Sequence, residues 1–400
     1  MNETIHNNTI QWDYETLWPT EKVKEAGCYF YDIPIEKYIS TTEVEVARYG
    51  RMTLFGGYSY LSLHMDSRIS DAVKKSLDIT GTGGHGARLL AGTSNIHKEL
   101  ERKISRFKQT EDAITFSTGY IANISTIPAL VGRQDTIIAD RLNHASIIDG
   151  CILSRAAFKR FRHNDMEHLE ELLKQNNRGK VLVIADAVFS MDGDIFNLPV
   201  AAELCKKYGA LLMIDECHAL GVIGKTGKGI EEHFGLPTNT IDIKMGTLSK
   251  SIPSQGGYIA ASENIIHYLK HQSRGFIYSG ANAPTNDVAS AVALDIIKTE
   301  PERVTKLHAN IAYAKTKLQQ AGIAVMDSQT AILPILCGED WAAWEMAKYC
   351  HQEGIYIQAI PYPVVPKGQA RLRLSINTDH TKEQIDKIVE VLSSARRLSS

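Results

Sequence analysis

Short apolar runs alternate with helical segments through the middle of the chain, and this alternation constrains the fold more than any other feature. The apolar runs are the length of strands and are apolar throughout, as strands are when both faces of a sheet are covered. They lie at residues 113–116, 136–139, 181–185, 211–214, 241–245 and 258–261. Helical periodicity appears at residues 96–107, 121–131, 166–174, 200–208 and 265–271. The pattern predicts an α/β fold with a mostly parallel sheet.

The chain changes character on both sides of this region. Residues 1–55 contain aromatic residues such as Trp12, Trp18 and Tyr31, and we expect them to form an N-terminal arm that packs against another surface, such as a partner subunit. Beyond residue 299 the segments indicate helix 302–321, strand 331–337, helix 341–353, strand 371–376 and helix 382–395. We therefore expect an arm (1–55), a large domain (56–299) and a smaller C-terminal α+β domain (300–400).

Charge, cysteine content and hydropathy exclude several classes of protein. The net charge is −2 with both signs interspersed, which gives no electrostatic reason to expect nucleic acid as a partner. Six scattered cysteines without a CxxC pair indicate reduced thiols and no metal site. The N-terminus has no signal pattern, and no apolar stretch reaches the ~20 residues of a membrane span. We expect a cytoplasmic protein without a transmembrane segment.

Polar residues that can perform chemistry follow two of the predicted strands. Asp215 ends the run 211–214, and His218 lies three residues later. The run 241–245 leads into Thr247, Ser249 and Lys250. A lysine can hold an aldehyde as an imine, and a carboxylate can keep a pyridine nitrogen protonated so that the ring accepts electrons. This set predicts a pyridoxal phosphate (PLP) site, and with it carbanion chemistry beside an amine.

Two further segments bear on a phosphate site. Ser117-Thr118-Gly119-Tyr120 lies between a predicted strand and a predicted helix, where backbone amides can hold a phosphate; an ordinary helix cap would use the same residues. GTGGHG at 81–86 matches the dinucleotide pattern GxGxxG, but that pattern requires a strand before it, and here the preceding segment is helical. We interpret the second segment as a loop on the substrate side of the site.

The chain resembles the α-oxoamine synthases, fold type I PLP enzymes of the aspartate aminotransferase type. The family includes 8-amino-7-oxononanoate synthase, 2-amino-3-ketobutyrate CoA ligase and serine palmitoyltransferase. The segments that carry the resemblance occur in family order between about residues 50 and 395. They are GTGGHGARLLAGTSNIHKELE, FSTGYIAN, DRLNHASIIDG, VFSMDGD, IDECHALGVIG, GTLSKSIPSQGGYI, FIYSGANAP and ARLRLSINTDHT.

The resemblance implies a role for each matching residue. Lys250 would carry the cofactor and move the α-proton, Asp215 would pair with the ring nitrogen, and His218 would hydrogen-bond the phenolic oxygen. His144 would stack on the ring, and Arg373 would bind the amino-acid carboxylate. The residues that would hold or flank the cofactor are Ser117, Thr118, Gly119, Tyr120, Asp186, Ser190, Thr247, Ser249 and the partner subunit's Ser279.

The substrate side of the site departs from the family pattern. Tyr58 stands where most members have an asparagine that touches the substrate, and Ala87 precedes Arg88 of the glycine-rich loop, near the substrate side chain. The Ala87 methyl leaves room for a β-carbon, and Tyr58 offers a hydroxyl. We therefore expect serine or alanine to be preferred over glycine.

The resemblance also implies the reaction and the assembly. A seven-stranded large domain and a smaller C-terminal domain would form homodimers with active sites at the interface. The enzyme would join an amino acid to an acyl thioester, carried by coenzyme A or by an acyl carrier protein, with loss of carbon dioxide. An aminotransferase or an aldol-type lyase would use the same cofactor residues. A non-catalytic partner subunit is a further alternative, but such subunits lack the lysine that is present here as Lys250.

Overall fold

The computed structural model describes residues 18–176 and 179–399, with side chains up to residue 396. Its centre is a seven-stranded sheet in the order β4-β10-β9-β8-β7-β5-β6. The strands are β4 (Asp112–Phe116), β5 (Thr136–Asp140), β6 (Ala157–Phe161), β7 (Val181–Asp186), β8 (Leu211–Asp215), β9 (Ile243–Thr247) and β10 (Gly257–Ala261). β10 runs antiparallel to both of its neighbours, and the pairs from β9 to β6 are parallel. The prediction of a mostly parallel sheet is confirmed.

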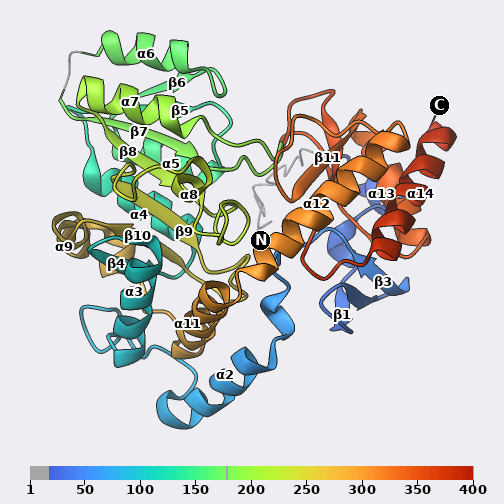
Figure 1. Ribbon diagram of the computed structural model, residues 1–400, viewed down its shortest axis with the longest axis horizontal. Helices are drawn as coiled ribbons and strands as arrows, with labels where there is room; N and C mark the ends of the chain where they lie inside the picture. Colours follow the sequence, from blue (N-terminus) through green and yellow to red (C-terminus); the bar gives the residue numbers. More distant parts are fainter. Residues whose placement is uncertain (1–17, 177–178, 400) are drawn as a thin grey trace, which may run out of the picture.

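Helices cover both faces of this sheet (Figure 1). Alternate residues of a strand point to opposite faces, so Val181 and Val183 of β7 enter one apolar cluster while Leu182 and Ile184 enter another. The first cluster contains side chains of α3 (Asn95–Lys108), α6 (Met166–Lys174), α7 (Leu198–Tyr208), α8 (Ile230–Phe234) and α11 (Pro284–Thr299). The second contains side chains of α4 (Gly119–Leu130), α5 (Ala145–Ser154) and α9 (Glu263–Gln272), with the short α10 (Arg274–Ile277) against it. Burial on both faces explains why these strands are apolar throughout.

The C-terminal part is built on a three-stranded sheet in the order β11-β14-β13. Its elements are α12 (Glu302–Gln320), β11 (Ile332–Gly338), α13 (Asp340–Gln352), β12 (Ile355–Tyr356), β13 (Ala359–Ile360), β14 (Ala370–Ser375) and α14 (Lys382–Ser399). The segments predicted from the sequence match these elements, except for the two-residue strands β12 and β13. A smaller α+β region after α11 is therefore present.

The N-terminal segment packs on this C-terminal part of its own chain. It contains α1 (Thr20–Glu25), a 3-10 turn at Phe30–Asp32, β1 (Ile35–Tyr38), β2 (Glu43–Val46) and β3 (Gly50–Leu54). β3 pairs in parallel with β12, and Trp18 donates from Nε1 to the carbonyl of Tyr362 at 2.8 Å. Figure 1 shows β1 and β3 beside the C-terminal helices. Trp12 lies outside the described residues, and the domain boundaries themselves stay a prediction.

A second 3-10 turn (Leu63–Met65) and α2 (Ser67–Thr80) connect the N-terminal segment to the large domain. α2 precedes the loop 81–86, so the strand that a dinucleotide fingerprint requires is absent there. Within the described residues no helix is both long and apolar enough to cross a bilayer, and the six cysteines are free thiols.

Candidate active site

Strand register brings the predicted catalytic residues to one edge of the central sheet. Asp186 at the end of β7 pairs with Asp215 at the end of β8, and Asp215 pairs with Met245 in β9. The carboxyl ends of these parallel strands therefore lie side by side, at the edge where open α/β sheets bind ligands. Lys250 follows β9 after a short turn.

A cavity of about 200 Å³ lies at this edge. Most of the residues predicted to hold the cofactor line it, although they come from five separate segments of the chain. They are Thr118, Gly119, Tyr120, His144, Asp186, Ser190, Asp215, His218, Thr247, Ser249 and Lys250.

Asp215 is 3% exposed, and both of its carboxylate oxygens are held by its own chain. Oδ2 accepts from Nδ2 of Asn123 at 2.8 Å, and Oδ1 accepts from the backbone N–H of Cys217 at 2.9 Å. Nδ2 of Asn123 also donates to Ser146, so α4 and α5 both help to fix this carboxylate. Sequence reasoning missed Asn123, and no local signal singles it out, because Ser125 and Thr126 are also buried polar residues of α4.

Asp186 supports the loop that carries His144. The backbone N–H of His144 donates to Oδ2 of Asp186 at 2.7 Å, and His144 Nδ1 lies 2.8 Å from the hydroxyl of Ser146. Burial raises the pKa of Asp186 well above its ordinary value, and the nearby Asp215 carboxylate adds to the rise. Burial lowers the pKa of His144, which keeps its ring neutral at pH 7.

The start of α4 forms a cradle for an anion. Thr118 caps the helix by accepting from the N–H of Ile121 at 3.0 Å, while the first amides of a helix have no partner within it. A Cβ on Gly119 would lie 3.3 Å from Thr247 and from Met245, so a side chain there would fit only if these neighbours shifted. The hydroxyls of Thr247 and Ser249 lie 2.8 Å apart beside the cradle. The hydroxyl of Tyr120 bonds to Asp149, and Ser117 does not line the cavity.

Tyr60, which sequence reasoning also missed, connects His218 to Arg373. Arg373 donates from a terminal nitrogen to the Tyr60 hydroxyl at 3.2 Å, and that hydroxyl lies 2.8 Å from Nδ1 of His218. Burial lowers the pKa of His218 well below 6.5, with Lys250 and Arg373 adding to the effect. The guanidinium of Arg373 can only donate, so the Tyr60 oxygen accepts from it. The Tyr60 hydroxyl therefore donates its proton to Nδ1 of His218, and the neutral His218 ring carries its own proton on Nε2.

The guanidinium of Arg373 is anchored at three points. In addition to Tyr60, it donates from Nε to the carbonyl of Ser190 at 2.7 Å and from its other terminal nitrogen to Ser375 at 3.0 Å. A guanidinium has five N–H groups, so two remain for a ligand. Ser190 thus anchors Arg373 through its backbone carbonyl and also lines the cavity.

Besides Ser117, five predicted residues do not line this cavity within one chain: Tyr58, Ala87, Arg88, Ser279 and Arg373. Arg88 is buried in an ion pair with Glu101 at 2.8 Å. Ala87 forms an isolated strand bridge with Gly280, next to Ser279. Roles for Ala87, Arg88 and Ser279 at the site therefore stay predictions.

The residues present fit PLP. The cradle at α4 suits a phosphate, the buried Asp215 carboxylate suits a protonated ring nitrogen, and the Nε2–H of His218 suits a phenolic oxygen. Lys250 provides the amine for the aldehyde. Among the described residues, no group of histidine, cysteine and carboxylate side chains is arranged to bind a metal ion.

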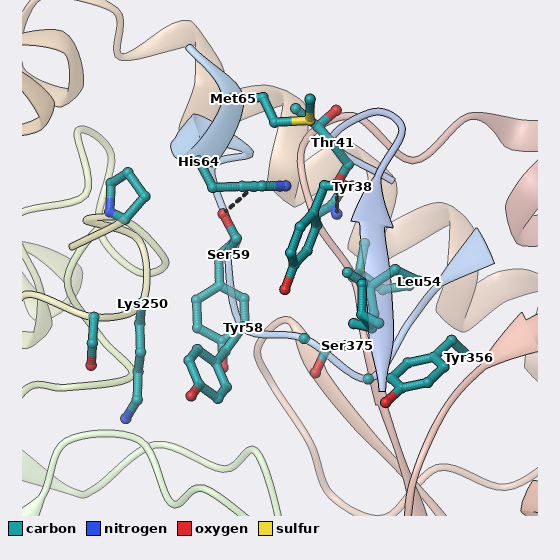
Figure 2. A pocket seen from close by; sticks show the side chains of 18 of the residues that line it. Tyr38, Thr41, Leu54, Tyr58, Ser59, His64, Met65, Lys250, Tyr356 and Ser375 are labelled. Atoms are coloured by element: carbon teal, nitrogen blue, oxygen red, sulfur yellow. Dashed lines mark hydrogen bonds between the residues drawn. The ribbon is translucent and has the colours of Figure 1, made fainter. Parts of the chain in front are cut away.

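A second cavity, of about 540 Å³, adjoins the first, and Ser249 and Lys250 line both (Figure 2). Tyr58 lies in its wall and is 48% exposed. Figure 2 shows the Tyr58 ring beside Lys250.

Several known proteins are similar to this chain in sequence and in fold. The model of the aminotransferase class I and II family matches residues 52–392. The 8-amino-7-oxononanoate synthase 1 of Bacillus velezensis is 41% identical over 85% of this chain and 87% of that protein. The serine palmitoyltransferase of Sphingobacterium spiritivorum is 39% identical over 92% of each chain. A solved serine palmitoyltransferase variant from S. paucimobilis with a bound PLP–myriocin aldimine superposes with a TM-score of 0.91 at 30% identity, covering 94% of this chain and 96% of that one.

Proposed function

The chain belongs to the aminotransferase class I and II family, and within it to the α-oxoamine synthases, and we propose that it joins a small amino acid to an acyl thioester to give an α-amino ketone. It has the type I fold and is a PLP-dependent enzyme. The two relatives differ in their acyl chemistry by name: an oxononanoate ends in a carboxylate, whereas a palmitoyl group does not.

The observation that carries this proposal is the pair of cavities that share Lys250. The smaller cavity holds the residues that fit PLP, and the larger one leaves space for a second substrate beside the lysine. A condensation needs two substrates at one reactive centre, whereas an aminotransferase binds its two substrates in turn.

PLP, when bound, supplies an electron sink that stabilises negative charge on the carbon beside the amine. The protein's own residues would stabilise the electron-accepting form of the ring and carry out the proton transfers. The carboxylate of Asp215 would keep a proton on the ring nitrogen, and His218 would donate from Nε2 to the phenolic oxygen. His144 would hold the ring in place. Lys250 takes the proton from the α-carbon at Nζ and returns a proton there at the end.

Arg373 orients the amino acid. Its two remaining N–H groups match a carboxylate, and the anchors at Ser190, Ser375 and Tyr60 fix the direction of that pair. A carbon–carbon bond then forms between the α-carbon and the acyl carbon, and the carbon–sulfur bond breaks to release the thiol. The amino-acid carboxylate leaves as carbon dioxide, and the overall reaction takes up one proton.

A screen of amino acids against acyl thioesters, with thiol and carbon dioxide release as the readouts, tests the proposal. We expect serine or alanine to support thioester-dependent release of both products. Exchange of amino groups with a keto acid and no thiol release would identify an aminotransferase. Cleavage of a β-hydroxy amino acid without thioester would identify an aldol-type lyase. No turnover with any pair would indicate a non-catalytic subunit.

We also propose a homodimer, because the family resemblance assigns Ser279 to the cofactor phosphate and Ser279 does not line the cavity of its own chain, so the partner's Ser279 would have to supply this contact. The thioester carrier is coenzyme A or an acyl carrier protein, and both belong in the screen. A cytoplasmic location is supported by the reduced state of the six cysteines.

A further inference from the structure

The larger cavity holds the acyl part of the second substrate. It begins at Ser249 and Lys250 and extends toward Leu54 and Tyr356 (Figure 2). A volume of about 540 Å³ lies in the ~300–1,000 Å³ range that holds drug-sized ligands, and it exceeds what a small amino acid needs. In the proposed condensation the acyl carbon reacts beside Lys250, so the rest of the acyl chain extends into this cavity.

The walls of this cavity carry apolar and uncharged polar side chains. Leu54, the rings of Tyr38 and Tyr356, and the hydroxyl of Ser375 are examples. Lys250 is the one lysine or arginine in the lining formed by the described residues, and it is already committed to the cofactor. Among the described residues of this subunit, an acyl chain that enters the cavity therefore meets no lysine or arginine in the wall besides Lys250. Arg373 lies behind Tyr60 and Ser375 and is assigned to the amino-acid carboxylate.

His64, the remaining basic residue of the wall, is not a cation either. Burial lowers its pKa below 6.5, partly offset by the Asp379 carboxylate, so the ring is neutral at pH 7. Ser59 lies 3.0 Å from its Nδ1, and its Nε2 is buried with no hydrogen-bond partner. A neutral ring of this kind can bond a neutral group but cannot balance a negative charge.

A negative charge lies directly behind the same wall. Thr41, which lines the cavity, donates to Oδ2 of Asp379 at 2.8 Å. Lys306 pairs with Asp379 at 3.1 Å on the exposed side, which reduces this charge without placing a cation in the cavity. A carboxylate at the end of an acyl chain would lose its hydration here and gain no partner, which is unfavourable.

We propose that the acyl group that this enzyme transfers ends in an uncharged chain, not in a carboxylate, and that this chain lies in the cavity between Lys250 and Leu54. The inference rests on the proposed condensation and selects between the two kinds of acyl group that it allows.

The test compares two thioesters of matched length on the PLP-loaded enzyme: heptanoyl-coenzyme A and 6-carboxyhexanoyl-coenzyme A. Thiol release is followed with the amino acid that gives the fastest turnover. We expect kcat/KM to be at least about tenfold higher for the heptanoyl thioester, because an unpaired carboxylate is costly to bury. Equal values, or a preference for the carboxylated thioester, would overturn the inference but leave the proposed function intact. No thiol release from either acyl group, carried by coenzyme A or by an acyl carrier protein, with any amino acid would overturn both.

A pair of variants tests where the acyl chain of the substrate lies. Tyr38 lines the cavity and is 49% exposed, so both Tyr38→Lys and its uncharged control Tyr38→Gln are expected to fold. For each variant, kcat/KM for the carboxylated thioester is divided by kcat/KM for the heptanoyl thioester. Because the new ammonium can pair with the carboxylate, this ratio should be about fivefold higher in Tyr38→Lys than in Tyr38→Gln, the upper range for a partly exposed ion pair. The same ratio in both variants would show that the acyl terminus does not lie in this cavity.

Discussion

At the residue scale, the site depends on side chains whose orientation is fixed before any substrate binds. Asp215 is buried, and Asn123 and the amide of Cys217 hold its two oxygens in one plane. Arg373 is held in the same way by Ser190, Ser375 and Tyr60. Groups fixed in this way need no reorganisation when charge develops, which is the main source of electrostatic catalysis.

Asp215→Asn should lower kcat about 10²–10³-fold, because a neutral amide cannot keep the ring nitrogen protonated. The amide has the shape of the carboxylate, but only one of its two ends can accept a hydrogen bond, so the midpoint of thermal unfolding should fall while the variant stays folded. Steady-state kinetics and a thermal melt of the same preparation check the two parts. Near-normal turnover in a folded variant would show that Asp215 does not act on the ring nitrogen.

Arg373→Lys should raise KM for the amino acid at least about tenfold and affect the thioester much less, because an ammonium loses the two-point grip on a carboxylate. Arg371→Lys is the matched control. Arg371 lies on the same face of β14 but donates to Met191 and Asp192, away from the cavity. A similar rise for both substrates in Arg373→Lys would instead indicate a structural role.

The sequence could point to the candidate site residues that follow strands, but not to those that connect distant segments. Lys250, Asp215 and His218 each follow an apolar run, which marks the end of a buried strand. Tyr60 meets its partners His218 and Arg373 across 158 and 313 positions of the chain. No local pattern relates residues so far apart, because the fold alone brings them together.

At the element scale, the loop between β7 and α7 joins the two parts of the molecule. Ser190 and Asp192 of this loop accept from Arg373 and Arg371 of β14. Asp194, at its other end, pairs with His163, which also pairs with Asp140 at the end of β5. The loop therefore connects the central sheet to Arg373, the residue proposed to bind the amino acid.

The pairing of His163 should make stability depend on pH. Burial lowers the pKa of His163, but the hydrogen bonds to Asp140 and Asp194 outweigh burial and raise it to about 10. A raised folded-state pKa gives stability that is complete below pH 6.5 and is lost as the pH rises through about 10.

His163→Gln should therefore destabilise the protein by about 3 kcal/mol near pH 7, the scale of charge-assisted hydrogen bonds. Thermal melts of the wild type and the variant between pH 6 and pH 10.5 check this. The difference between their unfolding midpoints should become smaller toward pH 10.5. A difference between the midpoints that stays constant over this pH range would contradict the ion-pair assignment.

Strands buried on both faces could be located from the sequence to within two residues, whereas β6 could not. β6 has the sequence AFKRF and lies at the edge of the sheet, where Lys159 and Arg160 remain partly or fully exposed. An edge strand needs no continuous apolar run, so the signal that marks the inner strands is missing. The antiparallel direction of β10 likewise depends on its neighbours in space and not on its own residues.

At the scale of the whole molecule, two surface loops lie together. Ala87 bridges Gly280, and the N–H of Ala281 donates to the carbonyl of Gly86, so Ala87 and Ser279 belong to one region. In the proposed homodimer this region reaches the partner's site. The parallel pairing of β3 with β12 could not be predicted either, because the two strands are about 300 residues apart in the chain.

Ala87→Thr should shift the amino-acid preference toward glycine, because the added atoms fill the space of a β-carbon. One methylene in an apolar pocket discriminates by ~1–3 kcal/mol, so partial activity with serine and alanine should remain. Ala87→Val, which fills similar space without a hydroxyl, should behave alike if the effect is steric. A wild-type enzyme that already favours glycine strongly over serine and alanine would disprove this account of the pocket.

The central claim is that Lys250 holds PLP at the junction of the two cavities. Borohydride reduction of the yellow holoenzyme, followed by proteolysis and mass spectrometry, tests it most directly. We predict that the reduced cofactor is found on the peptide that contains Lys250, and that Lys250→Ala still binds PLP but acquires no covalent label and does not turn over. A reduced cofactor attached to any other lysine, or a Lys250→Ala variant with near-normal turnover, would contradict the claim.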